Sequence, residues 1–415
     1  MKAQAKTIAS TGHDLLAWLA QFGHHPRGVV AGSNVCLLAP AWQGSLGDEA
    51  VITAACQHLK ATHDAHITLI GFDKAEPWAK IDLIDERISV ADYFKTGGWP
   101  QRRRLARQLR NMDAFYLLGT DMLDGHYTEW HTTALLTIAH QAAFSGIPTN
   151  LVGFSLKGQP KDSAITGLRR ISRLAGVTAC LRDPVSLQRF YDATNERGVQ
   201  TADPAFLLQP DAGEHPVRAW IAESRAAGRL VLGLNLSSHV YDALSSNDRE
   251  RIEGAMVAAV AALADSHGPV SVLLIPHDIR HDFDDVAICE TLAARMAGEK
   301  DLEAVVMGPP YKAALIKSIT GSLDMVLSSR MHLAIAALGS GTPTACITYQ
   351  GKFEGLYQHF GIQGCTIAPD EAVDAKILTD FLISLADRRQ ALATAIVGAL
   401  PNVTKLARHN FDLAS

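Results

Sequence analysis

Residues 324–348 read DMVLSSRMHLAIAALGSGTPTACIT, and this stretch decides the fold. Short apolar runs at 324–328 and 343–348 are bounded by turn residues, as is typical of strands. Between them, residues 331–339 form an alanine-rich apolar segment that favours a helix, and glycine and proline follow it. A strand, a helix and a second strand in this order indicate a parallel sheet covered by helices, so we predict an α/β fold.

The same alternation extends in both directions from this stretch. Apolar segments that we predict to be strands lie at residues 35–40, 66–71, 112–119, 148–154, 176–182, 230–236, 270–276 and 302–307, and residues 199–206 close the first half. Amphipathic helices are predicted at residues 48–60, 132–144, 247–266, 284–296 and 311–318, with C-terminal helices over 371–408. This pattern predicts a parallel sheet in each half of the chain.

The length of the chain, 415 residues, predicts more than one domain. A single hydrophobic core stops growing at roughly 250–300 residues. The best linker is QPDAGEHP at 209–216, after which the strand–helix pattern starts again. We therefore predict Rossmann-like domains over 1–208 and 209–415, facing a cleft in which ligands bind at the carboxyl ends of the strands.

The composition is that of a globular protein, with 47% hydrophobic and 20% charged residues and a formal net charge of −5. This charge gives no reason to expect a nucleic-acid partner. The six cysteines form no C-x-x-C pair and are predicted to be reduced. Neither a signal peptide nor a run of roughly 18–20 apolar residues is present. We predict a cytoplasmic protein, and the basic residues of 102–110 leave open a peripheral contact with the inner face of a membrane.

The strongest chemical signal is Ser328-Ser329-Arg330-Met331-His332, between a strand and a helix. The first turn of a helix presents unpaired N–H groups and the positive end of its dipole, which together bind anions. Arg330 adds a planar fork for a carboxylate or phosphate, and His332 can move a proton near neutral pH. In the alternative interpretation, Arg330 pairs with an acidic neighbour and His332 packs in the first helical turn.

A second signal is Gln43-Gly44-Ser45-Leu46-Gly47-Asp48-Glu49-Ala50, directly after the first strand. Gly44 and Gly47 allow a tight turn and a close approach of a ligand to the backbone. Asp48 is a candidate catalytic group, although Asp48 or Ser45 could equally cap the helix. The stretch is neither a complete G-x-G-x-x-G fingerprint nor a Walker A loop.

Other polar residues also follow predicted strands. Arg182 ends a predicted strand and could point into the cleft, and Asp183-Pro184 is predicted to begin a helix. Tyr349 and Lys352 follow the last strand of the quoted stretch, and Lys352 is either a second cation for the anion or an ordinary loop lysine. The spacing of His277, Asp278, His281 and Asp282 fits no standard zinc pattern, so we predict no metal; Asp284 and Asp285 are predicted to cap the next helix.

Taken together, these motifs resemble the polysaccharide pyruvyl transferase family. Arg330-Met331-His332, Gly341, Pro343, Tyr349 and Lys352 match its C-terminal signature. GSLGDEAV at 44–51 is similar to its N-terminal turn, and LRDPVS, ADPAFLL, GLNLS and LLIPHD resemble segments that follow in the same order. The resemblance spans about residues 44–361.

The resemblance implies a fold like that of the GT-B glycosyltransferases, with an acceptor side in the first domain and a donor side in the second. It implies phosphoenolpyruvate as co-substrate, no other cofactor, and a sugar of a polysaccharide or lipid-linked precursor as acceptor of a pyruvate ketal. Arg330, the backbone of Met331, His332 and Arg182 would bind phosphoenolpyruvate. His332 would be the acid, and Asp48 is the candidate base.

The sequence departs from the family pattern at Thr120 and Asp121, where further glycines would be expected after a strand. This departure puts the acceptor side of the pocket in question. Two alternatives stay open. One is a GT-B glycosyltransferase that uses a nucleotide sugar, for which Glu354 could bind the ribose; the other is a non-catalytic relative that binds sugars or anions.

Overall fold

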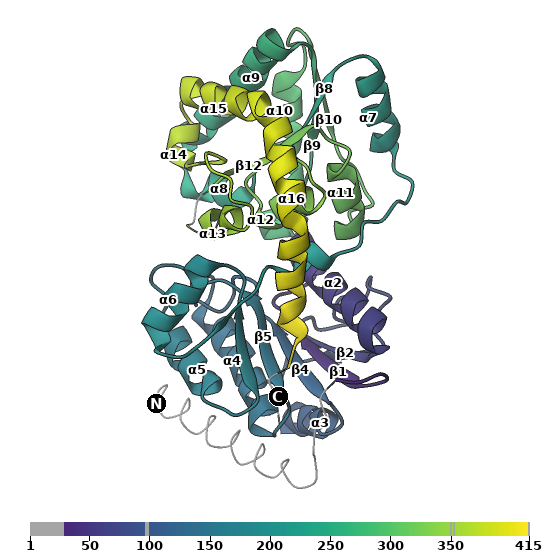
Figure 1. Cartoon of the computed structure of the whole chain (residues 1–415), viewed down its shortest axis with the longest axis vertical. Helices are drawn as coiled ribbons and strands as arrows, with labels where there is room; N and C mark the ends of the chain where they lie inside the picture. The colour runs from purple at the N-terminus through teal and green to yellow at the C-terminus, as the bar shows by residue number, and fades with distance from the viewer. Residues whose placement is uncertain (1–28, 96–98, 349–350, 352, 414–415) are drawn as a thin grey trace. The chain divides into compact units, whose positions relative to one another are not determined.

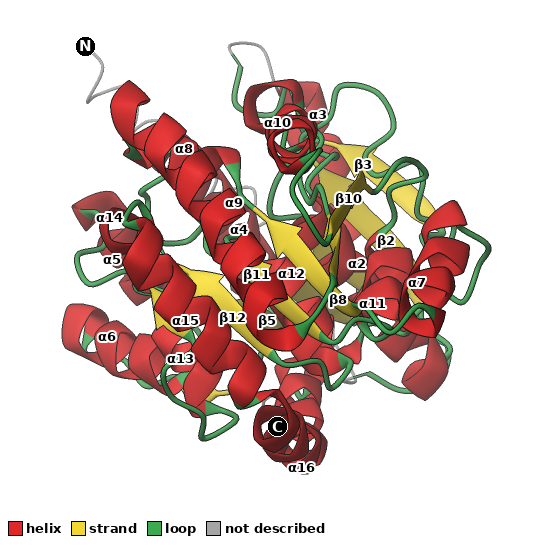
Figure 2. Ribbon diagram, turned by 90° about the horizontal axis from the view of Figure 1, so that it is seen from above, coloured by secondary structure: helices red, strands yellow, loops and turns green. Residues whose placement is uncertain are grey.

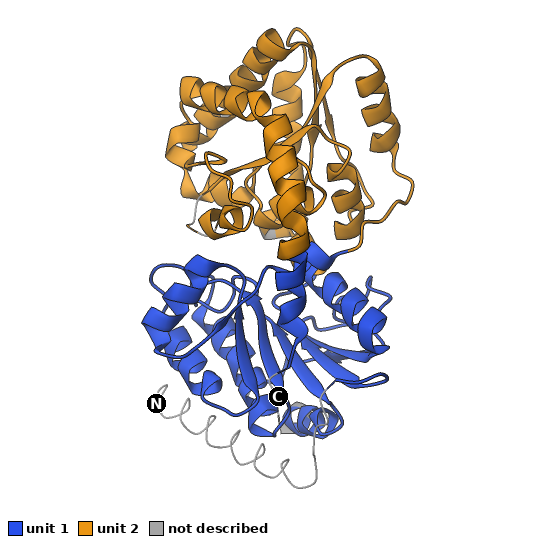
Figure 3. Ribbon diagram, in the orientation of Figure 1, with its two compact units in different colours: residues 1–43, 51–208, 404–415 blue, residues 44–50, 209–403 orange. Residues whose placement is uncertain are grey.

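The computed structural model describes residues 29–95, 99–348, 351 and 353–413 (Figure 1). The chain divides into two compact units (Figure 3). Unit 1 comprises residues 1–43, 51–208 and 404–415, and unit 2 comprises residues 44–50 and 209–403. Two short segments therefore differ from the expected domain ranges. Residues 44–50 belong to unit 2, and the C-terminal residues from 404 onward belong to unit 1.

In its described part, unit 1 holds a seven-stranded parallel sheet in the order β3-β2-β1-β4-β5-β6-β7. The strands are β1 Asn34–Leu38, β2 His66–Gly71, β3 Glu86–Ser89, β4 Ala114–Leu118, β5 Thr149–Phe154, β6 Val177–Leu181 and β7 Val199–Gln200. Strands β4 and β5 are buried along their whole length. Strands buried along their whole length are expected where helices cover both faces of a sheet.

The helices of unit 1 follow its strands, and Figure 2 shows strands flanked by helices. They are α3 Trp99–Leu109, α4 Glu129–Phe144, α5 Asp162–Ser172 and α6 Pro184–Thr194, together with most of α2 Leu46–His63. As predicted, Asp183 caps α6 and Pro184 opens it. Beyond β7, Asp203 caps a short 3-10 turn, η1 Pro204–Leu207. Proline is favoured at the first position of such a turn.

Unit 2 holds a six-stranded parallel sheet in its described part, in the order β10-β9-β8-β11-β12-β13. The strands are β8 Leu230–Asn235, β9 Val270–Leu274, β10 Leu302–Val306, β11 Met325–Ser328, β12 Thr344–Ile347 and β13 Thr366–Ile367. The helices include α7 Pro216–Ala226, α8 Ser238–Ala243, α9 Ser246–His267, α10 Val286–Met296, α11 Ala313–Thr320, α12 Met331–Gly339 and α13 Phe353–Gln358. The stretch at 324–348 is therefore a strand–helix–strand unit, as predicted.

Both sheets have the strand order of a Rossmann fold, and each has a point at which that order reverses. In unit 1 the first strand, β1, lies between β2 and β4, and in unit 2 the first strand, β8, lies between β9 and β11. Connections therefore leave the first strand in opposite directions, which opens a crevice at the carboxyl ends of the strands. In such sheets this crevice is where ligands bind, so a ligand is expected beside the residues that follow β1, β2 and β4 in unit 1, or β8, β9 and β11 in unit 2.

The end of the chain is tied into unit 1. The C-terminal helices are α14 Pro369–Ala372, α15 Ala375–Asp387 and α16 Arg389–Arg408, and the 3-10 turn η3 His409–Phe411 follows. Asn410 is fully buried there. Its Oδ1 accepts the backbone N–H of Gly153 at 2.8 Å, and its Nδ2 donates to the carbonyl of Ala202 at 2.7 Å. Asn150 donates from Nδ2 to the carbonyl of Asn410 at 2.9 Å. These bonds explain why the tail belongs to unit 1.

We predict that Asn410→Ala destabilises unit 1. The substitution leaves the N–H of Gly153 and the carbonyl of Ala202 buried without this partner, and each such loss costs about 1–3 kcal/mol. Urea denaturation should show a lower midpoint than in the wild type. Lys405→Ala, on an exposed position of the preceding helix, is the control and should leave the midpoint unchanged. Equal midpoints for both variants would contradict this account of the tail.

Candidate functional site

The junction between β11 and α12 lies at the carboxyl edge of the unit 2 sheet, beside the point where the strand order reverses. Arg330 is the N-cap residue of α12, with extended backbone angles, and its side chain makes no capping hydrogen bond. The N–H of Arg330 donates to Ser328 Oγ at 3.0 Å. The first turn of α12, which begins with Met331 and His332, is therefore not capped by the side chain that precedes it. A helix start of this kind can bind an anion, and the binding of an anion here stays a prediction.

The guanidinium of Arg330 is held by carboxylates. Its Nε and Nη2 donate to the two oxygens of Asp285 at 3.1 and 2.7 Å, and its Nη1 donates to Asp278 Oδ2 at 3.4 Å. Nη2 also donates to Ser238 Oγ and to the carbonyl of Phe283. The pairing that we considered as the alternative for Arg330 is thus present. It fixes the plane and position of the guanidinium.

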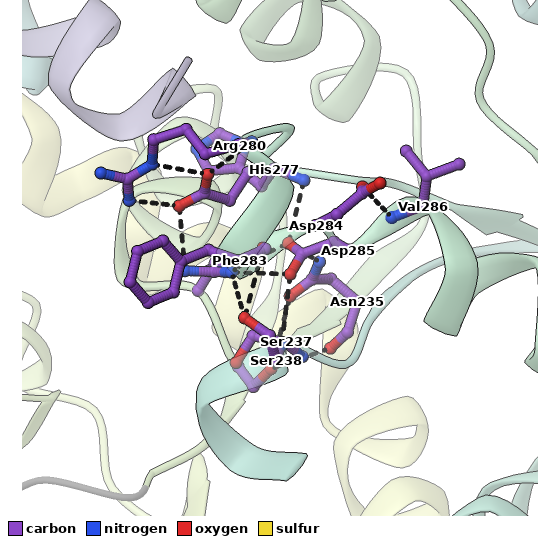
Figure 4. A network of polar contacts seen from close by, with 12 residues as sticks. Asn235, Ser237, Ser238, His277, Arg280, Phe283, Asp284, Asp285 and Val286 are labelled. Carbon is purple, nitrogen blue, oxygen red and sulfur yellow. Dashed lines mark hydrogen bonds and ion pairs between the residues drawn. The ribbon is translucent and has the colours of Figure 1, made fainter. Parts of the chain in front are cut away.

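Asp285 is the centre of this network (Figure 4), and it is fully buried. Besides Arg330, it accepts the N–H groups of Ser238 and His277 and the Nδ2 of Asn235, at 3.1–3.3 Å. The expectation that Asp285 caps α10 is wrong, because its side chain makes no capping bond there. Its neighbour Asp284 accepts the N–H of Val286 at 2.8 Å instead. The buried charge of Arg330 explains the difference, since an arginine buried in this way requires a carboxylate partner.

Arg280 contributes a second positive charge to the same edge of the sheet. Its Nε and Nη2 bond the two oxygens of Asp278 at 2.9 and 2.6 Å, and its guanidinium lies 4.8 Å from the centre of the Phe283 ring. Burial lowers the pKa of Arg280, but the hydrogen bond and charge of Asp278, with the charge of Asp48, outweigh this and leave the pKa raised. Arg280 therefore carries its charge at every relevant pH.

Residues 44–50 complete the cluster and belong to the same unit. Ser45 forms an antiparallel bridge with Asp278, and the N–H of Leu46 donates to the carbonyl of His277 at 3.3 Å. A Cβ on Gly47 would lie 2.4 Å from His332 Nδ1, so the backbone of this turn packs directly against the imidazole. Gly44 has a φ of +109°, and a Cβ there would lie 2.7 Å from Arg280 Cγ. Glycine is thus required at both positions, because the side chains of His332 and Arg280 lie too close to the backbone for a Cβ to fit.

Asp48 lies within this turn and is almost fully buried. Ser45 Oγ accepts the N–H of Asp48 at 3.3 Å, so Ser45 is the residue that caps α2. Glu49 has a structural partner, because its Oε1 accepts the N–H of Ala313 at the start of α11 at 2.8 Å. The carboxylate of Asp48 acts on Arg280 through its charge.

His277 is a residue of this site to which the sequence analysis gave no role. Only 3% of it is exposed, and within the described part of the chain neither ring nitrogen has a hydrogen-bond partner. Burial, with the charges of His332 and Arg330, lowers the pKa of His277 to about 3. The imidazole is therefore neutral, with one N–H donor and one acceptor. A buried polar group without partners is costly, and an incoming ligand could supply them.

The balance of charge limits how this cluster can bind an anion. The positive charges of Arg280 and Arg330 face Asp278 and Asp285 in direct ion pairs. An additional anion must be stabilised mainly by groups that these carboxylates do not neutralise. The first-turn N–H groups of α12 and the imidazoles of His277 and His332 have the required donors. Met331, half-buried in that turn, contributes its backbone.

Arg182 occupies a different setting. It lies in unit 1 at the end of β6, with 1% of its side chain exposed. Its Nη1 donates to Asp203 Oδ2 at 2.9 Å, and its Nη2 donates to Ser155 Oγ at 2.7 Å. These bonds join the end of β5 to the turn that begins at Pro204. The structure thus gives Arg182 a role in holding unit 1 together, and its binding of an anion stays a prediction.

The remaining predicted residues have separate outcomes. Tyr349 and Lys352 lie outside the described residues. Within the described ranges, no group of three or more histidine, cysteine, aspartate or glutamate residues could hold a metal ion. All six cysteines are buried and none forms a disulfide. Thr120, which replaces an expected glycine, has a φ of +43°, the left-handed conformation that favours glycine.

Two Rossmann-like units with a polar cluster at a strand-end crevice define an α/β protein of the class that includes GT-B glycosyltransferases and sugar-nucleotide epimerases. This confirms the predicted fold class. The family model for polysaccharide pyruvyl transferase matches residues 46–351, which is most of the chain. The chain therefore belongs to the polysaccharide pyruvyl transferase family, as the motifs predicted.

Solved structures agree on the fold. An α,α-trehalose-phosphate synthase (UDP-forming) from Burkholderia vietnamiensis has 14% identity and a TM-score of 0.55, covering 94% of this chain and 96% of its own. UDP-GlcNAc 2-epimerase from Neisseria meningitidis, bound to UDP-GlcNAc, has 7% identity and a TM-score of 0.55, covering 91% and 97%. A glycosyltransferase from Rickettsia africae has 12% identity and a TM-score of 0.54, covering 91% and 98%. At these identities the likeness concerns the fold alone.

No curated protein matches the sequence. In the described ranges, no helix combines the length and the hydropathy that crossing a membrane requires.

We predict that Gly47→Ala displaces the imidazole of His332. A methyl group 2.4 Å from His332 Nδ1 cannot be accommodated unless the ring or the turn moves. The NMR signals of the His332 ring should shift, and the protein should lose stability. The matched control is Gly254→Ala in α9, where an added Cβ meets nothing within 4 Å. That variant should gain roughly 0.5–1 kcal/mol from the higher helix propensity of alanine. Unchanged His332 signals in Gly47→Ala would contradict the contact.

We also predict that His277→Gln reduces the pH dependence of stability. Because the pKa of His277 falls from 6.5 to about 3 on folding, the unfolded chain binds an extra proton between these values. Stability is therefore full above pH 6.5 and falls as the pH decreases, by about 1.4 kcal/mol per pH unit for this group. Burial lowers the pKa of His131 too, so the variant removes only part of the slope. An unchanged slope between pH 4 and 6 would contradict a neutral, buried His277.

Proposed function

We propose that this protein transfers pyruvate from phosphoenolpyruvate to a sugar of a polysaccharide or its precursor, forming a pyruvate ketal. The observation that carries this proposal is the position of Arg330, Met331 and His332 at the start of α12, inside the family match. The substrate has a carboxylate, a phosphate and a carbon that must be protonated. The cluster offers helix-end N–H groups, fixed guanidinium groups and imidazoles, which suit these requirements.

The donor would lie against the first turn of α12. The N–H groups of that turn bind one of its anionic groups, aided by the helix dipole. The neutral N–H of His277 donates to the same anion, which gives the buried imidazole the partner that it lacks among the described residues. Arg330 and Arg280 add a fixed positive field at short range, although each is paired with an aspartate. Because these charged groups are in position before the donor binds, they need little reorganisation during the reaction.

His332 would act as the general acid. It gives a proton to the methylene carbon of phosphoenolpyruvate, and the adjacent carbon becomes electrophilic. A sugar hydroxyl oxygen adds to that carbon, and a second hydroxyl oxygen then displaces phosphate by breaking its bond to the same carbon. Of the two hydroxyl protons, one restores the proton of His332 and the other leaves with phosphate.

Asp48 is the proposed base for the hydroxyl protons. It is almost fully buried and close enough to Arg280 to affect its pKa. The carboxylate lies in the turn that also contacts His332 through Gly47. A carboxylate and an imidazole in one cluster allow protons to be taken up and delivered there.

A second candidate function is a glycosyltransferase that uses a nucleotide sugar. It is favoured by the fold shared with a trehalose-phosphate synthase described as UDP-forming. In this candidate, Glu354, an exposed residue of α13, would bind the ribose. The acceptor, whether lipid-linked or polymeric, and a position at the inner face of a membrane are further proposals for either enzyme.

We predict that phosphoenolpyruvate stabilises the protein against thermal unfolding and that UDP-glucose does not. Ligand at about 100 times its dissociation constant adds roughly 2.7 kcal/mol. His332→Ala and Arg330→Lys should each lose most of the shift, the first by removing an imidazole donor and the second by removing the fork that Asp285 holds.

The matched control is His267→Ala, at the far end of α9 in the same unit, where the imidazole bonds Asp387. This variant should retain the full shift with phosphoenolpyruvate. A shift that survives in His332→Ala would contradict the assignment of that residue. A shift with UDP-glucose and none with phosphoenolpyruvate would support the second candidate function in place of the first.

A further inference from the structure

Unit 1 carries a cluster of aromatic rings that the donor site does not use. We call it the aromatic platform, and it consists of Trp42, Phe72, Phe94, Trp130 and His131. The rings of Trp42 and His131 are stacked, with centres 4.8 Å apart and planes at 29°. Phe72 lies 5.9 Å from Trp42 and 6.3 Å from Trp130, and Phe94 lies 5.8 Å from Trp130. These contacts form one continuous group of rings.

The platform lies where a Rossmann-like sheet binds its ligand. Trp42 follows β1, Phe72 follows β2 directly, and Trp130 and His131 lie in the first turn of α4, after β4. Strands β2, β1 and β4 are neighbours, and the strand order reverses beside β1. The platform is therefore at the carboxyl edge of the sheet, at the reversal point. This is the place in unit 1 that corresponds to the Arg330 cluster in unit 2.

The rings are buried on one side and exposed on the other. Phe72 and His131 are buried, whereas 39% of Trp42 and 53% of Trp130 are exposed. Two large exposed indoles on a shared base are unusual, because their exposure forgoes hydrophobic stabilisation. The base is rigid. His131 bonds the carbonyl of Pro40 through Nε2 at 2.6 Å, and burial lowers its pKa, so it is a neutral support for the Trp42 ring.

A hydrogen-bonding group lies beside the rings. Asp73 follows Phe72, and its Oδ1 accepts the N–H of Gln43, the residue after Trp42, at 3.4 Å. Its other oxygen, Oδ2, has no hydrogen-bond partner within the described residues. Burial raises the pKa of Asp73, as expected of a carboxyl group that lacks a compensating charge. An aromatic face next to an unsatisfied carboxylate is suited to a ligand with an apolar face and hydroxyl groups.

We propose that the aromatic platform is the acceptor site of unit 1 and binds a neutral pyranose sugar. The C–H face of the sugar packs on Trp42 and Trp130, and its hydroxyls donate to Asp73. This inference rests on the proposed function, which requires a sugar acceptor. An anionic ligand fits less well, because the negative charge of the Asp73 carboxylate, which is joined to the residue after Trp42, would repel it. A neutral sugar meets no such repulsion.

The test follows the six tryptophan indole N–H signals by NMR during titration of the full-length protein. The probes are methyl β-D-glucopyranoside and methyl β-D-galactopyranoside, each up to about 50 mM, well above the millimolar dissociation constants of weak sites. The signals of Trp42 and Trp130 should shift with at least one glycoside. Trp130→Ala should weaken binding about tenfold or more, and Trp130→Phe should largely restore it because the ring is kept.

Trp220→Ala is the matched control, since Trp220 lies in unit 2 and bonds Glu303. It should leave glycoside binding unchanged. The thermal shift with phosphoenolpyruvate should persist in Trp130→Ala, which separates this inference from the proposed donor site. Glycoside binding without any phosphoenolpyruvate effect would support the platform and contradict the proposed function.

Two results would overturn the inference. One is the absence of any shift of the Trp42 and Trp130 signals with both glycosides in a protein whose other signals show it to be folded. The other is a shift of these signals with uridine alone, which would make the platform a site for a nucleobase.

Discussion

The ion pair between Arg330 and Asp285 is the interaction on which the carboxyl edge of unit 2 depends. Its two bonds of 2.7 and 3.1 Å are buried, and Asp285 also accepts hydrogen bonds from residues after β8 and β9. One carboxylate thus ties together the ends of three adjacent strands, β8, β9 and β11. Removing either member of such a pair leaves an uncompensated buried charge, at a cost of about 3–5 kcal/mol. The arrangement of the polar cluster therefore depends on this ion pair.

The same pair sets the geometry of the proposed anion site. Because Asp285 and Asp278 hold the guanidinium of Arg330, its plane is set before any ligand arrives. In the proposed function, an anion is then bound chiefly by dipoles and imidazoles at the start of α12, rather than by a free salt bridge. The turn at residues 44–50 closes against His332 through a glycine, so the imidazole has little freedom to rotate. Fixed donors of this kind stabilise charge more effectively than mobile ones.

The sequence predicts the regular part of this molecule well. Strands β8, β9 and β11 and helix α12 were evident from apolar runs and glycine or proline signals, and the Arg330 junction follows from its place between a strand and a helix. Local patterns cannot reveal partners that are far apart in the chain. Asp285 looked like a helix cap because the buried arginine that it binds is 45 residues away. His277 had no visible role, since its unsatisfied ring is a consequence of burial.

Two other features could not be predicted from local sequence patterns either. The assignment of the C-terminal tail to unit 1 depends on Asn410, whose bonds to Gly153 and Ala202 span more than 200 residues of sequence. Thr120 was recognised as a departure from glycine, but only the backbone shows that the chain keeps the left-handed conformation there. A β-branched residue in that conformation is strained, so the turn is maintained by its surroundings, including the bond from the N–H of Ser155 to the carbonyl of Thr120 at 2.8 Å.

The two sheets share one strand order, but they differ in the side chains that lie at the point where this order reverses. Unit 2 places two arginines, three aspartates and two histidines there, whereas unit 1 places exposed indoles beside a single carboxylate. The first set suits a small, highly charged ligand, and the second suits a neutral ligand with a flat apolar face. A reaction that joins phosphoenolpyruvate to a sugar requires both kinds of site. Because a duplicated fold does not by itself dictate different chemistry at its two crevices, the contrast is the strongest structural argument for two unlike substrates.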